Sequence, residues 1–392
     1  MRQSTSANYR GGLMRQAVIV AIVLALAPGA AAAGKLPAPT AAKLPTPASA
    51  ELCGRCHRAI HDSWATSAHA TAMTSPAFLD AEYAAEEQFG IEARKVCLGC
   101  HAPMAGLLND LELSRKVSWE GITCDYCHSI REVAAAGPNH KSVVQFGPVK
   151  SGPSKTSVSP AHGTAYSSVH TSALLCAVCH EHKNRLGFPI VTTYSEWKDS
   201  PSGKGDVECQ QCHMELVQGA VVEPRVRRES SHLVNLHSMP GSHSVSQLNK
   251  ALTAKLTASR NGQNVDVAVK VKNEGAGHFL PTGSPMRQMI LEVRVTSAGV
   301  VTGTGNRAYT RVLADAEGKP IQQEYVAFMN AAKVVSDTRL APDETRTESF
   351  SFKVPAGQTA RVDAIFYYFH PATADPDKSG RIKFLELSKS LP

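Results

Sequence analysis

Every cysteine in the chain belongs to one repeated pattern, Cys-x-x-Cys-His. The 392-residue sequence contains ten cysteines, and five such motifs use all of them. The motifs are Cys53/Cys56/His57, Cys97/Cys100/His101, Cys124/Cys127/His128, Cys176/Cys179/His180 and Cys209/Cys212/His213. All five lie before residue 215, so the chemistry that they support is confined to the first part of the chain.

Three chemistries use a Cys-x-x-Cys pair: a zinc site, a redox disulfide and the attachment of haem. Zinc sites combine two such pairs, or add histidines at finger spacing, and do not require a histidine directly after each second cysteine. A disulfide framework needs no histidine, and a thioredoxin-like motif occurs once rather than five times. Cys-x-x-Cys-His is the attachment signature of c-type haem, in which two thioethers hold the porphyrin and the histidine binds the iron. The sequence therefore predicts five covalent haem c groups, with His57, His101, His128, His180 and His213 as the proximal ligands.

The N-terminal residues have the pattern of an export signal. Arg2, Arg10 and Arg15 precede an apolar run that ends in small residues, which predicts a signal peptide over residues 1–33. An uncleaved membrane anchor is the alternative, but Ala17 to Leu26 is only ten residues, short of the roughly 20 that span a bilayer. No later segment is apolar enough to span, so we expect no transmembrane segment after cleavage.

The next residues, 34–50, are rich in proline, alanine and threonine, which predicts a flexible linker. The formal net charge of +7 includes the three arginines of the predicted signal peptide. The remaining basic residues are scattered, and the densest cluster, at 225–228, is typical of a solvated loop. We therefore expect no nucleic-acid partner.

The composition of the chain changes near residue 245. Residues 51–246 are predicted to form a pentahaem cytochrome c domain that is mainly helical and irregular, with the haems forming much of its core. Within it, residues 81–97 predict a helix and residues 128–163 predict loops, because they are rich in glycine, proline and serine. After residue 246 apolar and polar residues alternate, which predicts an antiparallel β-sandwich domain over residues 247–392. The segments with this pattern are 264–275, 289–299, 348–357 and 361–369.

Each low-spin haem needs a second axial ligand, and eleven of the 16 histidines remain after the proximal ones. His69 is twelve residues beyond His57, about 18 Å along a straight helix, so it is placed to reach a neighbouring haem rather than its own. His140 and His162 stand in predicted loops, where binding to iron would account for their order. Residues 232–243 offer three histidines just after the last motif.

Three further residues are possible ligands. His278 stands in a loop flanked by glycine and proline between predicted strands, from which it could cap a haem across the domain boundary. Met73 and Met214 are alternatives to histidine, and a methionine ligand would raise the potential of its haem.

The order of the motifs resembles that of the cytochrome c-554-like family of multihaem c-type cytochromes. The resemblance rests on "CGRCHRAIHDSWATSAHATAM", "VCLGCHAPM", "GITCDYCHSI", "LLCAVCHEH" followed by "TTYSEWKDSP", and "VECQQCHM", and it covers roughly residues 51–290. It implies haems in close stacked and perpendicular pairs, mostly with two histidine ligands. By position it implies that His69, His162 and His237 are distal ligands, with His243 possible and His140 a weaker match.

The function predicted from these features is electron transfer by an exported cytochrome. Electrons would pass along the five haems between redox partners such as other cytochromes, a quinol-linked membrane complex or a terminal reductase. The predicted location is the periplasm or the cell surface of a bacterium.

Two other functions remain open from the sequence. One is a multihaem oxidoreductase that acts on a small nitrogen or sulfur compound at one open haem. No acid–base or nucleophilic constellation stands out and no motif has lysine in place of its histidine, so we assign no catalytic residue and favour a carrier over a catalyst. The other is a structural subunit of a surface assembly that docks through the β domain.

Overall fold

The computed structural model describes residues 47–227, 231–369 and 380–392. The predicted signal peptide and most of the predicted linker lie outside the described residues. The last linker residues are described, and they are held in place. Ser49 accepts a hydrogen bond from the Leu52 N–H and so caps α1 (Ala50–Gly54), while the Ala48 N–H donates to Asp125 Oδ2 at 2.7 Å.

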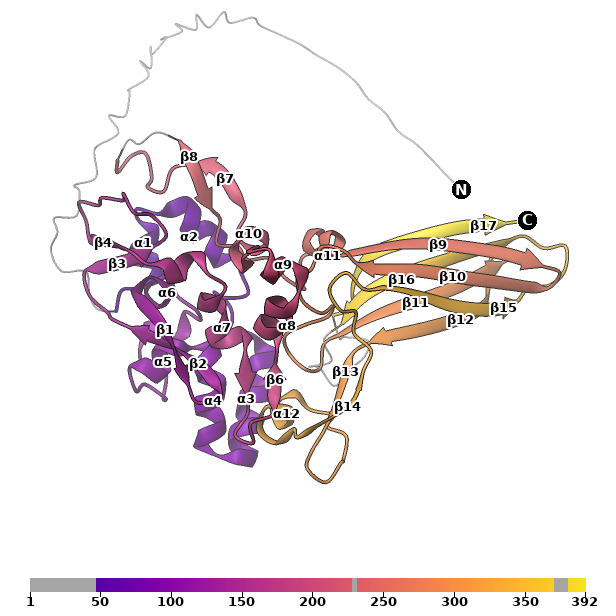
Figure 1. Ribbon diagram of the computed structural model, residues 1–392, viewed down its shortest axis with the longest axis horizontal. Helices are drawn as coiled ribbons and strands as arrows, with labels where there is room; N and C mark the ends of the chain where they lie inside the picture. The colour runs from indigo at the N-terminus through magenta and orange to yellow at the C-terminus, as the bar shows by residue number, and fades with distance from the viewer. Residues whose placement is uncertain (1–46, 228–230, 370–379) are drawn as a thin grey trace, which may run out of the picture. The chain divides into compact units, whose positions relative to one another are not determined.

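Short helices joined by turns and two-stranded sheets make up the described chain through residue 251 (Figure 1). Each Cys-x-x-Cys-His motif lies on or directly after one of these helices, so its two cysteines and its histidine are held close together. The helices are α1, α2 (Arg58–Ala65), α3 (Pro76–Phe89), α4 (Ile91–His101), α5 (Pro103–Leu107), α6 (Cys124–Ser129), α7 (Leu174–His180), α8 (Thr193–Asp199), α9 (Pro201–Lys204), α10 (Cys209–His213) and α11 (Val245–Ala251). Two 3-10 helices, η1 (Lys116–Trp119) and η2 (Ser168–Thr171), complete the set.

The predicted helix over residues 81–97 is two helices in the structure. α3 begins at Pro76, whose fixed φ suits the first helical position, and it ends before Gly90. Gly90 has a φ of 76°, a left-handed value that favours glycine, and α4 starts at the next residue. The apolar periodicity continues across the break, so it did not reveal that the chain turns there.

The segment 128–163, predicted to be loops, contains paired strands. β1 (Ile130–Ala136) and β2 (Asn139–Val144) form an antiparallel hairpin around Gly137, and β3 (Val149–Gly152) pairs in parallel with β4 (Gly163–Tyr166). These strands are short and lack a regular alternation of apolar residues, so the sequence carried little signal for them. Two more small antiparallel pairs follow, β5 (His182–Lys183) with β6 (Pro189–Val191) and β7 (Leu216–Gly219) with β8 (His232–Asn235).

Antiparallel strands dominate after residue 251, as the sequence predicts. One sheet has the order β15–β10–β9 and another has the order β12–β11–β16–β17 (Figure 1). Their strands are β9 (Leu252–Asn261), β10 (Asn264–Asn273), β11 (Gln288–Ser297), β12 (Val300–Tyr309), β15 (Thr345–Lys353), β16 (Ala360–Phe369) and β17 (Ile382–Leu391). A separate pair joins β13 (Arg311–Ala314) to β14 (Lys333–Asp337), and α12 (Glu324–Asn330) lies between them in sequence.

Both larger sheets contribute to one hydrophobic core. Alternate residues of β10 and β11 are buried, so one face of each strand is apolar and excluded from solvent. Val267 from the first sheet and Val293 and Phe366 from the second belong to the same cluster of buried side chains. The four predicted strand segments correspond to β10, β11, β15 and β16.

The described residues belong to one compact unit. None of its described helices has the length and apolar character needed to cross a membrane.

Candidate haem-binding sites

A large cavity runs among the helices that carry the motifs. Its volume is about 2740 Å³, and pockets for a single small ligand are about 300–1,000 Å³. Cysteines and histidines of the first four motifs line it, together with Gln210 and Gln211 from within the fifth. The cavity is therefore large enough for several bulky cofactors and is surrounded by the residues predicted to attach them.

The cysteines are arranged for attachment rather than for holding a metal ion directly. All ten are free thiols. Within the described part of the chain, no group of three or more Cys, His, Asp or Glu side chains could hold a metal ion by itself. Burial raises the pKa of Cys97 and of Cys127 to about 12, so both thiols are protonated at neutral pH. These features fit the predicted thioether attachment better than a zinc site or a redox disulfide.

Thiols from different motifs lie next to one another. The thiols of Cys124 and Cys53, of Cys179 and Cys100, and of Cys176 and Cys209 are close enough to perturb each other's pKa. The attachment points of motifs 1 and 3, of 2 and 4, and of 4 and 5 are thus close together. Groups attached there would be close neighbours.

Most of the predicted ligand histidines are oriented through one ring nitrogen. The Nδ1 atoms of seven of them lie 2.6–3.0 Å from a main-chain carbonyl oxygen, to which an Nδ1–H can donate. These are His57, His101, His128, His162, His213, His237 and His278. A hydrogen bond at Nδ1 fixes the tautomer and directs the lone pair of Nε2 outward, which is the arrangement of a metal-binding histidine.

His69 is oriented differently, because its Nδ1 lies 2.9 Å from the Sδ atom of Met239. A thioether sulfur is a weak acceptor. Sequence reasoning did not single out Met239, and a residue that contacts a ligand rather than the metal leaves no motif to find.

Four motif histidines each face a second histidine. The ring centroids are 6.2 Å apart for His57 and His162, 6.1 Å for His69 and His180, 6.2 Å for His128 and His237, and 6.3 Å for His213 and His278. An imidazole nitrogen binds a metal at about 2 Å and lies about 1 Å from its ring centroid, so two rings on opposite sides of one metal have centroids about 6 Å apart. The four separations therefore fit a single metal between each pair of rings.

The first motif and the residues that follow it illustrate the arrangement. His57 faces His162, whereas His69, only twelve residues later, faces the histidine of the fourth motif. His278, from the loop between β10 and β11, faces the histidine of the fifth motif.

The second motif differs from the other four. The ring of His101 stacks on Phe78 with centroids 3.9 Å apart and planes 7° apart. Its Nδ1 lies 3.0 Å from the Ala72 carbonyl oxygen, a main-chain contact like those of the histidines in motifs 1, 3 and 5. The ring contact of this histidine is thus with a phenylalanine.

Two histidines approach His128. His170 is closer, with centroids 5.5 Å apart, but its Nε2 lies 3.0 Å from the Cys127 carbonyl oxygen. Its Nδ1 is buried and has no hydrogen-bond partner among the described residues. His237 has its Nδ1 on a carbonyl and so presents Nε2, like the other oriented histidines.

The remaining candidates lie in different surroundings. His140 contacts Tyr194, with ring centroids 5.5 Å apart, rather than a motif histidine, and its Nδ1 is also buried without a partner among the described residues. His243 and Met214 line the cavity. Met73 is fully buried in a cluster of apolar side chains, which is a packing role.

Burial favours the neutral form of several of the site histidines. It lowers the pKa of His180 to about 3 and that of His237 to about 4. It also lowers the pKa values of His69, His101, His128 and His278. A neutral imidazole has the lone pair that a metal requires, so the burial that disfavours protonation also favours ligation.

The arrangement of these sites fits the predicted multihaem c-type cytochrome. Comparison with known proteins finds one matching family model and a similar solved structure. Residues 52–129 match the family described as cytochrome c554 and c-prime. The match covers the first three of the five motifs and agrees with the family that the motif order resembles.

Among solved structures, the fold is similar to "Crystal structure of a penta-heme cytochrome c552 from Thermochromatium tepidum". The TM-score is 0.69 at 21% sequence identity, and the alignment covers 88% of this chain and 98% of the other. No curated protein matches the chain.

Proposed function

We propose that this cytochrome carries five covalent haem c groups and passes electrons along them between redox partners. The thioether attachments are the ten cysteines of the five motifs, and His57, His101, His128, His180 and His213 are the proximal ligands. The distal ligands are His162, His69, His237 and His278 for the first, fourth, third and fifth motifs respectively. The haem groups supply one-electron redox chemistry, and the protein holds, spaces and insulates them.

One observation carries this proposal: four motif histidines face a second histidine at the separation expected for two ligands on one metal. Two histidine ligands leave a haem iron no open position for a substrate, so such haems act as carriers. Two histidine ligands also keep the potential low compared with histidine and methionine.

The contacts between motifs support a continuous path. The attachment cysteines of motifs 1 and 3, 2 and 4, and 4 and 5 are close enough to perturb each other's pKa, and Cys127 of motif 3 interacts electrostatically with Cys176 and Cys179 of motif 4. Every motif is therefore linked to the others through its neighbours. Electrons entering at any one haem would reach the rest by short steps.

The location, partners and domains are part of the same proposal. We infer that the protein is exported to the periplasm or the cell surface, because c-type haem motifs follow a predicted signal peptide. The partners would be other cytochromes, a quinol-linked membrane complex or a terminal reductase. The haem domain would span residues 51–246 and a β-sandwich domain residues 247–392, and the shared core of the two larger sheets supports the sandwich.

Two measurements on the purified full-length holoprotein test the proposal. Intact mass spectrometry should give the polypeptide mass plus five haems, and the Cys176→Ser/Cys179→Ser variant should give one haem fewer. Low-temperature EPR of the ferric protein should show at least four of the five haems as low-spin.

Fewer than five haem masses, or more than one high-spin haem, would contradict the assignment. Rapid consumption of nitrite or hydroxylamine by the reduced protein would instead favour an oxidoreductase.

A further inference from the structure

The loop that carries His278 is held on one side by the strand-rich part of the chain. It joins β10 to β11, and Asn273, the last residue of β10, donates from Nδ2 to the His278 carbonyl at 2.9 Å and to the Leu340 carbonyl at 3.2 Å. The main chains of Leu280 and Leu340 exchange two hydrogen bonds, of 2.9 and 3.0 Å. The loop backbone is thereby anchored both before and after His278.

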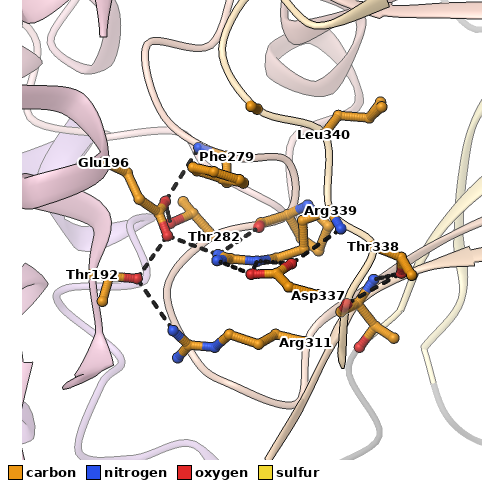
Figure 2. Close-up of polar contacts among 12 residues, drawn as sticks. Thr192, Glu196, Phe279, Thr282, Arg311, Asp337, Thr338, Arg339 and Leu340 are labelled. Atoms are coloured by element: carbon orange, nitrogen blue, oxygen red, sulfur yellow. Dashed lines mark hydrogen bonds and ion pairs between the residues drawn. The ribbon is translucent and has the colours of Figure 1, made fainter. Parts of the chain in front are cut away.

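A buried carboxylate on α8 holds the other side of the loop. Glu196 Oε2 accepts hydrogen bonds from the Phe279 N–H at 3.2 Å and from Thr282 Oγ1 at 2.6 Å (Figure 2). Its Oε1 accepts from Thr192 Oγ1 at 2.6 Å and from Arg339 Nη1 at 2.7 Å. The side chain of Glu196 is only 6% exposed, so these four contacts replace water almost completely.

Arg339 connects this carboxylate to the strand-rich part. Its Nε and Nη2 donate to the carboxylate of Asp337 at 2.9 and 2.8 Å, and its guanidinium lies over the Phe279 ring, 4.7 Å from the centroid (Figure 2). The side chain of Arg339 is 9% exposed. Glu196, Arg339 and Asp337 therefore form one ion network that spans from α8 to the end of β14, buried at Glu196 and Arg339 and partly exposed at Asp337.

The network reaches His278 through a single residue. The N–H of Phe279 is bound by Glu196, and its carbonyl oxygen lies 2.9 Å from His278 Nδ1. The ring of His278 then faces that of His213, with planes 21° apart. Gly277 adds a steric constraint, because a Cβ there would lie 2.9 Å from Ser202 Cβ on α9.

We propose that the Glu196–Arg339–Asp337 network positions His278 as the distal ligand of the haem attached at Cys209 and Cys212. Glu196 and Arg339 are positioning residues, because they act on the ligand through Phe279. The inference rests on the proposed function, since it takes His278 to be a haem ligand. Apolar side chains of similar volume are often at least as stabilising as a buried ion network. The directional hydrogen bonds of the network are, however, suited to fixing the position of the His278 loop.

The test is competition between His278 and carbon monoxide in the reduced full-length holoprotein. The variant is Glu196→Gln, which keeps the shape of the side chain but removes its charge. The matched control is Glu348→Gln, because Glu348 is also a poorly exposed partner of an arginine, Arg307, but lies on β15. His278→Gly is the reference for complete loss of the ligand.

We expect Glu196→Gln to raise the apparent affinity of one haem for carbon monoxide at least about tenfold, the change that corresponds to losing one or two hydrogen bonds. Glu348→Gln should bind carbon monoxide like the unaltered protein. His278→Gly should leave one additional haem open to carbon monoxide and high-spin in the ferric EPR spectrum.

The outcomes separate the two proposals. If His278→Gly opens one haem but Glu196→Gln does not, or if both glutamine variants open a haem equally, the positioning role is refuted while the ligand assignment stands. If His278→Gly opens no haem, the ligand assignment itself fails. Should Glu196→Gln not fold, Asp337→Asn releases only the second anchor of Arg339, and unchanged carbon monoxide affinity in that variant refutes the positioning role.

Discussion

The buried ion pair between Lys150 and Asp125 gives a sharp test of how the third motif is held. Asp125 stands between the two cysteines of that motif, and its side chain is fully buried. Lys150 Nζ donates to its Oδ1, and the side chain of Lys150 is 14% exposed. The carboxylate also accepts hydrogen bonds from the Ala48 N–H at 2.7 Å and from Ser129 Oγ at 3.1 Å.

The change Lys150→Met removes the cation that is paired with Asp125 and leaves a buried carboxylate. Breaking a buried ion pair from one side costs about 3–5 kcal/mol. Because two neutral donors remain, we expect a loss near the lower end, about 3 kcal/mol in the free energy of unfolding. Adding Asp125→Asn removes the stranded charge as well, so the double variant should recover at least about 2 kcal/mol of that loss.

Guanidinium unfolding of the holoproteins, followed by circular dichroism, measures these differences. The control is Lys116→Met, because Lys116 pairs with Glu51 at 2.6 Å but the two side chains are 71% and 63% exposed. We expect no measurable change there, since water solvates and screens such a pair. Equal losses for Lys150→Met and Lys116→Met, or no recovery in the double variant, would refute the reasoning from burial.

Three further predictions concern single positions. Gly121→Ala should lower the free energy of unfolding by more than about 1 kcal/mol, measured by thermal unfolding. The loss should exceed that of Gly137→Ala, because both glycines have positive φ but only a Cβ at 121 would lie 2.2 Å from the His69 carbonyl oxygen. Met239→Gln replaces a weak acceptor at His69 Nδ1 with a strong one, which makes the imidazole a more basic ligand. Redox titration should show that the potential of one haem falls by roughly 40 mV for each 1 kcal/mol of added hydrogen bonding. Phe366→Ala empties part of the strand-rich core and should cost about 3–5 kcal/mol in denaturant unfolding without changing the haem spectra.

The local parts of this protein follow directly from sequence. A thioether site needs two cysteines and a histidine within five residues, so the chemistry at Cys53, Cys56 and His57 is readable without knowing the fold. The strands β10 and β11 were predictable for a similar reason, because their apolar residues alternate with the period of a strand against a core. The hairpin of β1 and β2 was missed because its partly exposed strands leave no such pattern.

The sequence by itself thus predicted the class of cofactor and its points of attachment, and it determined the mixed character of the chain. Only the tertiary structure decided which histidines meet: His57 and His162, or His213 and His278, are far apart along the chain and are brought together by packing. It also decided that Glu196 of α8 and Arg339 beyond β14 share one buried network. The physical reason is that haem attachment depends on residues that are neighbours in the chain. Two histidines that bind one metal must instead approach it from opposite sides, and no local spacing in the sequence encodes that approach.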